Sequence, residues 1–164
     1  MRRTVGMTLV LVVAASLIAV AQVGGKTKAD PRLRRALNDA SLKFTEKSNG
    51  DFSLHFTLEG GRTHVVVAES KTEKLGVIEV REVWAIGWKG KREPSATVAN
   101  KLLRDNARKK VGAWQLNQED GTYFALFNVK VSADTEGDAL KTIVFGVANT
   151  ADEMEKDLLD SDDF

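Results

Sequence analysis

The sequence contains no cysteine, and among its 164 residues there are only two prolines and two histidines. Without cysteine the chain can form no disulfide, no thiolate metal or redox site, and no lipid-modified cysteine at a cleavage site. Its residues are 43% hydrophobic and 29% charged, which excludes global disorder. The length suits one domain that depends on its apolar core for stability.

The first 21 residues have the pattern of a secretory signal peptide. Arg2 and Arg3 precede an uncharged apolar run over residues 7–20, and Ala-Val-Ala at 19–21 fits the small-x-small rule for signal peptidase. The run is shorter than the roughly 20 residues that a bilayer span needs. We therefore expect cleavage after Ala21 and a periplasmic or secreted protein. An uncleaved membrane anchor is the alternative, and a twin-arginine route fits less well.

Residues 22–30 are expected to form a linker, residues 31–160 a single domain, and residues 161–164 an acidic tail. Three signals predict helix starts: Asp30 before a proline, Ser95, and Thr135 with an acid three residues later. The helices would run from 31 to about 40, from 96 to about 110, and from about 136 to 159. Acids at a helix C-terminus oppose the helix dipole, so the last five residues are expected to fray.

Alternating apolar and polar residues predict strands between these helices. Four strands are expected before the second helix, near residues 42–45, 52–58, 63–68 and 75–88. Two more surround the turn at Asp120-Gly121. The predicted order is α-β-β-β-β-α-β-β-α, an α+β fold with helices packed on an antiparallel sheet. In the last hairpin we expect four residues to form sheet core: Trp114, Leu116, Tyr123 and Phe127.

The two histidines lie on consecutive predicted strands. If Gly60-Gly61 is a two-residue hairpin loop, Phe56 pairs with Val65, and His55 and His64 become diagonal neighbours on one face. Two histidines there could contribute to a transition-metal site, but no third ligand is evident. The simpler interpretation is two half-exposed strand residues, so no metal or cofactor is expected. A site at His55 and His64 remains the alternative.

Exposed aromatic residues are the candidate binding residues. Trp84 and Trp88 share a face of the predicted strand at 75–88, which Glu82 interrupts. The strand after Asp120-Gly121 has apolar side chains on both faces, with Phe124 and Leu126 on the second one. These four residues are predicted to bind another protein. The alternative for the tryptophans is a place in the core or a subunit interface.

Charge is unevenly distributed along the chain. Residues 89–110 carry eight lysines and arginines against two acids, and residues 134–164 carry ten acids against two lysines. Two oppositely charged helices that lie near one another or flank one sheet explain this pattern. A nucleic-acid patch is the alternative for the basic segment, but export and the acidic segment argue against it.

The sequence shows no catalytic signature. It has no Gly-x-Ser-x-Gly or Ser-x-x-Lys motif, and Glu79 and Glu82 point to opposite faces of their predicted strand. Gly60-Gly61 precedes a strand, so it cannot cradle a phosphate at a helix N-terminus. We therefore expect a protein that is not an enzyme.

Two segments resemble the YbjN-like family of bacterial sensory transduction regulators, over roughly residues 32–159. They are DFSLHFTLEGGRTHVVVAE, after a short helix, and LLRDNARKKVGAWQLNQEDGTYFALFNVKV. In the second segment a helix ends near Asn106, and a small-residue–aromatic strand, an Asp-Gly turn and an apolar strand follow. The resemblance implies a fold like that of type III secretion chaperones and a domain that binds proteins or dimerises. It implies no catalytic residues, and the signal peptide departs from the cytoplasmic chaperones.

The leading hypothesis is an exported, non-catalytic protein-binding or chaperone-like regulatory module. Its partner would be another protein or a second copy of the chain, with no nucleic acid, and with no membrane contact after signal cleavage. The alternative is a periplasmic domain that binds a small ligand or a metal. A hydrolase is the third hypothesis, and it has the least support.

Overall fold

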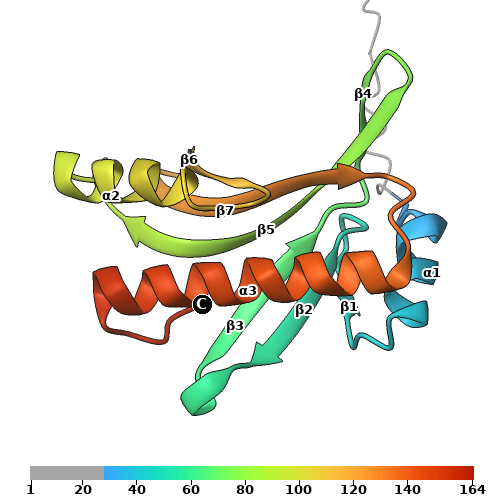
Figure 1. Cartoon of the computed structure of the whole chain (residues 1–164), viewed down its shortest axis with the longest axis horizontal. Coiled ribbons are helices and arrows are strands. Elements are labelled where there is room, and N and C mark those ends of the chain that lie inside the picture. Colours follow the sequence, from blue (N-terminus) through green and yellow to red (C-terminus); the bar gives the residue numbers. More distant parts are fainter. Residues whose placement is uncertain (1–27) are drawn as a thin grey trace, which may run out of the picture.

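The computed structural model describes residues 28–164, which form one antiparallel sheet and three helices (Figure 1). The predicted signal peptide and most of the predicted linker lie outside the described residues. The sheet has the order β1-β2-β3-β5-β7-β6, and β4 pairs with β5 outside this path. The predicted α+β class is confirmed, but the order gains one short strand, β4. In chain order the elements are α1 (Pro31–Asp39), β1 (Thr45–Glu46), β2 (Phe52–Thr57), the 3-10 turn η1 (Glu59–Gly61), β3 (Thr63–Ala68), β4 (Glu73–Leu75), β5 (Ile78–Gly90), α2 (Ala96–Asn106), β6 (Ala113–Glu119), β7 (Thr122–Ser132) and α3 (Gly137–Leu159).

Helix α3 lies across one face of the sheet, where it packs on β3, β5 and β7 (Figure 1). Full burial of a leucine, valine or methionine side chain stabilises a fold by about 1.5–3 kcal/mol, so the apolar stripe of α3 fixes the helix on this face. The stripe recurs at helical spacing, and its buried members are Leu140, Val144, Val147, Ala151 and Met154.

Helix α2 packs against β6 at the end of the sheet. It ends at Asn106, earlier than predicted, because the Asn106 side chain turns to accept a hydrogen bond from the backbone of Trp114 at 2.6 Å. The indole Nε1 of Trp114 donates to Asp105 at 2.8 Å. Lys101 of α2 forms an ion pair with Asp157 of α3. The two oppositely charged segments therefore meet, as predicted.

A buried arginine joins α1 to the sheet. Asp30 caps α1 as predicted, by accepting a hydrogen bond from the backbone N–H of Arg32 at 2.8 Å. The same carboxylate accepts a hydrogen bond from Arg81 of β5 at 2.7 Å. Arg81 is only 2% exposed and also donates to the carbonyls of Glu69 and Ala133. Since a buried charge is tolerated only with such partners, this network holds α1 against β5.

The register of β2 and β3 differs from the prediction by one residue. Residues 58–62 connect the two strands, in place of a two-residue loop, so Phe56 pairs with His64 and not with Val65. Because side chains alternate along a strand, this shift moves every side chain of β3 to the other face. His64 therefore lies in the core and His55 is exposed on the opposite face, so the predicted placement of both on one face is wrong.

A β-bulge separates the two tryptophans of β5. Ile86 pairs with Leu126 of β7, but the register then shifts and Trp88 pairs with Ala125. The additional residue turns Trp88 to the side of α3, where it packs against the core. The prediction that Trp84 and Trp88 share a face is therefore wrong. Glu82 pairs regularly with Lys130, so the strand is regular there and irregular at the bulge.

The strand predicted at 75–88 is a hairpin of β4 and β5. Gly76 adopts a positive φ of 60° in the turn, and the hairpin projects from the body of the molecule (Figure 1). Val77 at its tip is fully exposed.

In the β6–β7 hairpin, Trp114 and Phe127 are buried as predicted. Leu116 and Tyr123 are not, and Leu116 is 48% exposed.

Helix α3 differs from the prediction at its start. The Thr135 hydroxyl donates to the Ser132 carbonyl at 2.7 Å and does not cap the helix. The N-cap position is Glu136, whose side chain makes no capping hydrogen bond. The hydroxyl therefore closes the turn before α3, and the predicted capping box is wrong.

At its C-terminus α3 ends at Leu159 as predicted, and the following residues leave the helix. Asp160 adopts a left-handed conformation with φ of 51°, which reverses the chain. The backbone N–H of Asp163 then donates to Glu155 at 2.5 Å. The ring of Phe164 lies 6.4 Å from that of His64. The acidic tail therefore folds back on the end of α3.

Candidate functional site

Three of the four predicted binding residues meet in one groove on the face of the sheet opposite α3. Trp84 comes from β5, and Phe124 and Leu126 come from β7, the neighbouring strand. The groove has a volume of about 410 Å³. All of its lining residues belong to strands, except Glu69, which directly follows β3: Glu69, Glu82, Trp84, Ile86, Gln115, Asn117, Gln118, Glu119, Phe124 and Leu126.

Strand alternation explains why these side chains point into the groove. Val83 and Ala85 of β5 face α3 and are fully buried, so Trp84 and Ile86 face the other way. Leu126 lies directly across from Ile86, and its side chain is 5% exposed. Trp84, Ile86 and Phe124 are only partly covered. The floor of the groove is therefore apolar and accessible to a partner.

Carboxylates at the edge of the groove orient Trp84. The indole Nε1 of Trp84 donates to Glu69 Oε1 at 2.8 Å. Glu82, on the same strand face as Trp84, accepts hydrogen bonds from Asn128 at 2.5 Å and from Lys130 at 3.0 Å. Burial raises the pKa of Glu69, and the nearby Glu82 adds to this effect. The edge is therefore acidic, and the Trp84 ring is held in one orientation.

The lining residues can provide apolar contacts and hydrogen bonds. Gln115, Asn117 and Gln118 contribute amide groups from β6. Among the described residues that line the groove there is no serine, histidine or lysine to form a nucleophile–base pair. The chemistry of the groove therefore suits recognition, and the expectation that the chain is not an enzyme stays a prediction.

Trp88, the fourth predicted residue, does not contribute to the groove. The bulge places it on the side of α3, where its ring packs close to Gly90. Sequence reasoning missed the acidic edge and the β6 amides. Alternation along β5 indicates that Glu82, Trp84 and Ile86 share a face, and the predicted hairpin at Asp120-Gly121 pairs β6 with β7. The pairing of β5 with β7, which brings the two groups together, could not be read from the sequence.

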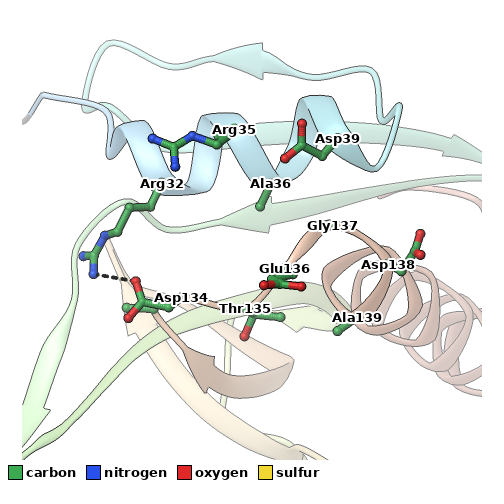
Figure 2. Close-up of a pocket in the computed structure, with 11 residues that line it drawn as sticks. Arg32, Arg35, Ala36, Asp39, Asp134, Thr135, Glu136, Gly137, Asp138 and Ala139 are labelled. Atoms are coloured by element: carbon green, nitrogen blue, oxygen red, sulfur yellow. Dashed lines mark hydrogen bonds and ion pairs between the residues drawn. The ribbon is translucent and has the colours of Figure 1, made fainter.

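A larger cavity, about 680 Å³, lies between α1 and the segment that leads into α3 (Figure 2). Arg32 reaches from α1 to Asp134 at 3.0 Å, while Arg35 and Asp39 lie apart from the charged side chains of the facing segment (Figure 2). Gly137 allows the close approach of the two helices, because a Cβ there would lie 3.0 Å from the Ala40 nitrogen. This cavity therefore lies where α1 and α3 pack together, and its lining side chains do not point toward a common ligand position.

The predicted histidine pair is separated by the sheet. The exposed His55 lies 3.5 Å from the hydroxyl of Ser53 on its own strand. The buried His64 faces α3, where it meets Asp152 and Glu155. No sequence pattern indicates this grouping, because it depends on the register of β3 and on the position of α3.

Comparisons of the chain with models of known protein families, with curated proteins and with solved structures each found no match. The resemblance to the YbjN-like family therefore stays a prediction. Among residues 28–164, none of the helices is long and apolar enough to cross a membrane.

Proposed function

We propose that this chain is an exported, non-catalytic protein-binding domain that recognises its partner through the groove of Trp84, Phe124 and Leu126. The observation that supports it most is the convergence of these side chains, with Ile86, on a sheet face that α3 does not cover. Export rests on the predicted signal peptide. The resemblance to the YbjN-like family, with its chaperone-like fold, supports the same function.

The groove suits an anchor residue from the partner. Tryptophan is among the residues that contribute most to binding when they sit in a desolvated pocket. The bond between Trp84 and Glu69 fixes the indole before binding, so less side-chain freedom is lost when a partner arrives. A protein interface of ordinary size covers about 800 Å² on each partner, so the contact would extend beyond the groove onto the surrounding strands.

The acidic edge favours a partner segment with basic residues beside its apolar anchor. Glu69, Glu82 and Glu119 all line the groove. Opposite charges at the rim of an interface increase the association rate and the specificity. Binding should therefore weaken as salt concentration rises, since exposed charges are screened over about 10 Å at 0.1 M salt.

The test is a selection of displayed peptides against the purified protein, followed by measurement of Kd for a selected peptide by fluorescence anisotropy. Selected peptides should combine an aromatic or aliphatic anchor with lysine or arginine. Loss of a central tryptophan costs an interface about 2 kcal/mol or more, so Trp84→Ala should raise Kd at least about 30-fold.

Val77→Ala is the matched control, because Val77 is a fully exposed apolar residue outside the groove. This variant should bind as the wild type does. Sedimentation of the protein alone tests whether the partner is a second copy, since Trp84→Ala would then abolish self-association. A monomer that selects no peptide, or a Kd unchanged by Trp84→Ala, contradicts the proposal.

A further inference from the structure

A second polar cluster lies on the other face of the sheet, between β3 and α3. His64 and Glu155 are fully buried there, and Asp152 is 9% exposed. The two acids are three residues apart on α3, so they point from the same face of the helix toward the strand. One ligating atom from each of the three side chains lies within 4.8 Å of the other two.

The imidazole of His64 is buried without a hydrogen-bond partner. Neither Nδ1 nor Nε2 has one among residues 28–164, and the nearby backbone of Ile86 lies outside hydrogen-bond geometry. Most buried polar atoms in proteins are paired, so two unpaired ring nitrogens require an explanation. A ring nitrogen of neutral imidazole that lacks a partner has a lone pair free to bind a ligand.

Arg62 compensates the two acids only in part. Its Nε donates to Asp152 Oδ1 at 2.6 Å, and its Nη2 donates to Glu155 Oε2 at 3.2 Å. One guanidinium carries a single positive charge against two buried carboxylates, and the other Glu155 oxygen accepts a hydrogen bond from the backbone N–H of Asp163 at 2.5 Å. An additional positive charge beside Glu155 would balance the pair.

The returning tail adds more negative than positive charge. Asp162 accepts a hydrogen bond from the backbone of Thr63 at 3.0 Å, and Lys89 lies 4.0 Å from Asp163. Asp162 and Asp163 also line the cavity beside His64, so the tail places two more carboxylates near the cluster.

The spacing of the ligating atoms suits a small transition-metal ion. His64 Nδ1 lies 3.6 Å from Glu155 Oε2. Two ligands of a tetrahedral zinc ion, each about 2.0–2.2 Å from the metal, lie about 3.4 Å apart. Asp152 accepts a hydrogen bond from Arg62 through Oδ1 and can turn Oδ2 toward the ion. Glu155 Oε2 accepts from Arg62 and Oε1 accepts from the backbone of Asp163, so the ion would replace Arg62 as the partner of Oε2.

A cavity of about 320 Å³ lies beside His64. Its lining comes from the ends of β2 and β3, with His64 and the exposed His55 among them, and from the tail residues Asp162, Asp163 and Phe164. Asp152 and Glu155 do not line it, so His64 is the member of the cluster that borders this cavity.

We infer that His64, Asp152 and Glu155 bind a divalent transition metal, with zinc as the best fit to one imidazole and two carboxylates. Calcium and magnesium prefer ligand sets made entirely of oxygen, and the sequence has no cysteine to provide a softer site. A fourth position is left for water or for a tail carboxylate. This site is independent of the groove, and it uses only one of the two histidines that the sequence singled out.

The experiment is a titration of tag-free protein with zinc chloride, followed by NMR of the imidazole nitrogens. The chain has only two histidines, so each ring can be assigned. One equivalent of zinc should shift the ring nitrogens of His64 and leave those of His55 unchanged. The same titration with magnesium should shift neither ring. This test needs no substitution in the core.

Calorimetry on variants provides the second measurement. Glu155→Gln and His64→Ala should each weaken zinc binding at least about tenfold, since a lost ligand costs no less than a lost outer-shell partner. His55→Ala, which removes the exposed histidine, should bind zinc as the wild type does. The inference is overturned if zinc shifts neither histidine, shifts only His55, or binds equally well to Glu155→Gln.

Discussion

Single residues determine the orientation of the tryptophans on the two faces of the sheet. Trp84 is oriented by Glu69, and the bulge at Gly87 separates Trp84 from Trp88. Gly87 is needed because a Cβ there would lie 2.4 Å from the ring of Trp114, which is itself held by its hydrogen bond to Asp105. The absence of a side chain at Gly87 therefore leaves room for the Trp114 ring beside the bulge.

Gly87→Ala should destabilise the protein. The Trp114 ring is buried and cannot withdraw without breaking its hydrogen bond, and overpacking of this kind typically costs about 1–3 kcal/mol. The free energy of unfolding from denaturant titration measures the effect. Gly146→Ala is the matched control, because an added Cβ there meets no atom within 4 Å in the middle of α3. That variant should be neutral or up to about 1 kcal/mol more stable. Equal stability of Gly87→Ala and wild type would show that Trp114 can move.

Among the elements, helix starts and apolar stripes were predictable, while strand faces were not. The capping roles of Asp30 and Ser95 and the buried stripe of α3 follow from local sequence. The face of His64 depends on a five-residue connection, and the face of Trp88 depends on a bulge. In both cases a shift of one residue in the strand pairing places every following side chain on the opposite face of the sheet. No local sequence pattern reveals such a shift. The sequence therefore predicted the groove in part and missed the cluster at His64.

The attachment of α1 to the sheet should be sensitive to acid. Burial opposes ionisation of Asp30, but hydrogen bonds from Arg32 and Arg81 outweigh it and lower its pKa to about 2. Hydrogen bonds from Arg32 and Thr72 also lower the pKa of Glu79 to about 2. The unfolded chain then binds protons that the folded chain does not, so stability is lost as pH falls from about 4 toward 2.

The variant Asp30→Asn isolates the contribution of this charge, because asparagine also caps helices. At pH 7 the variant should be less stable than the wild type. Between pH 5 and pH 2 the difference should shrink by on the order of 2 kcal/mol, the value of the pKa shift of Asp30. Chemical denaturation of both proteins across this range measures the difference. A difference that does not change with pH would show that Asp30 stabilises α1 through its cap alone.

The whole molecule has a sheet with two unlike faces. One face is covered by α3 and contains the core and the cluster of His64, Asp152 and Glu155. The other carries the groove, with its apolar floor and acidic edge. We propose a separate task for each face, partner recognition on the open one and metal binding beneath α3. The two unlike faces also account for the fact that three predicted binding residues meet in one place while Trp88 does not.

The most direct test of the central claim is photocrosslinking in the native cells. A photoreactive phenylalanine analogue at position 124, in the groove, is compared with the same analogue at position 77, at the tip of the β4–β5 hairpin. Position 124 should give one discrete crosslinked protein in the envelope fraction, and Trp84→Ala in the same chain should abolish it. Position 77 should not give that product. No product from position 124, or the same product from both positions, would contradict a partner bound in the groove.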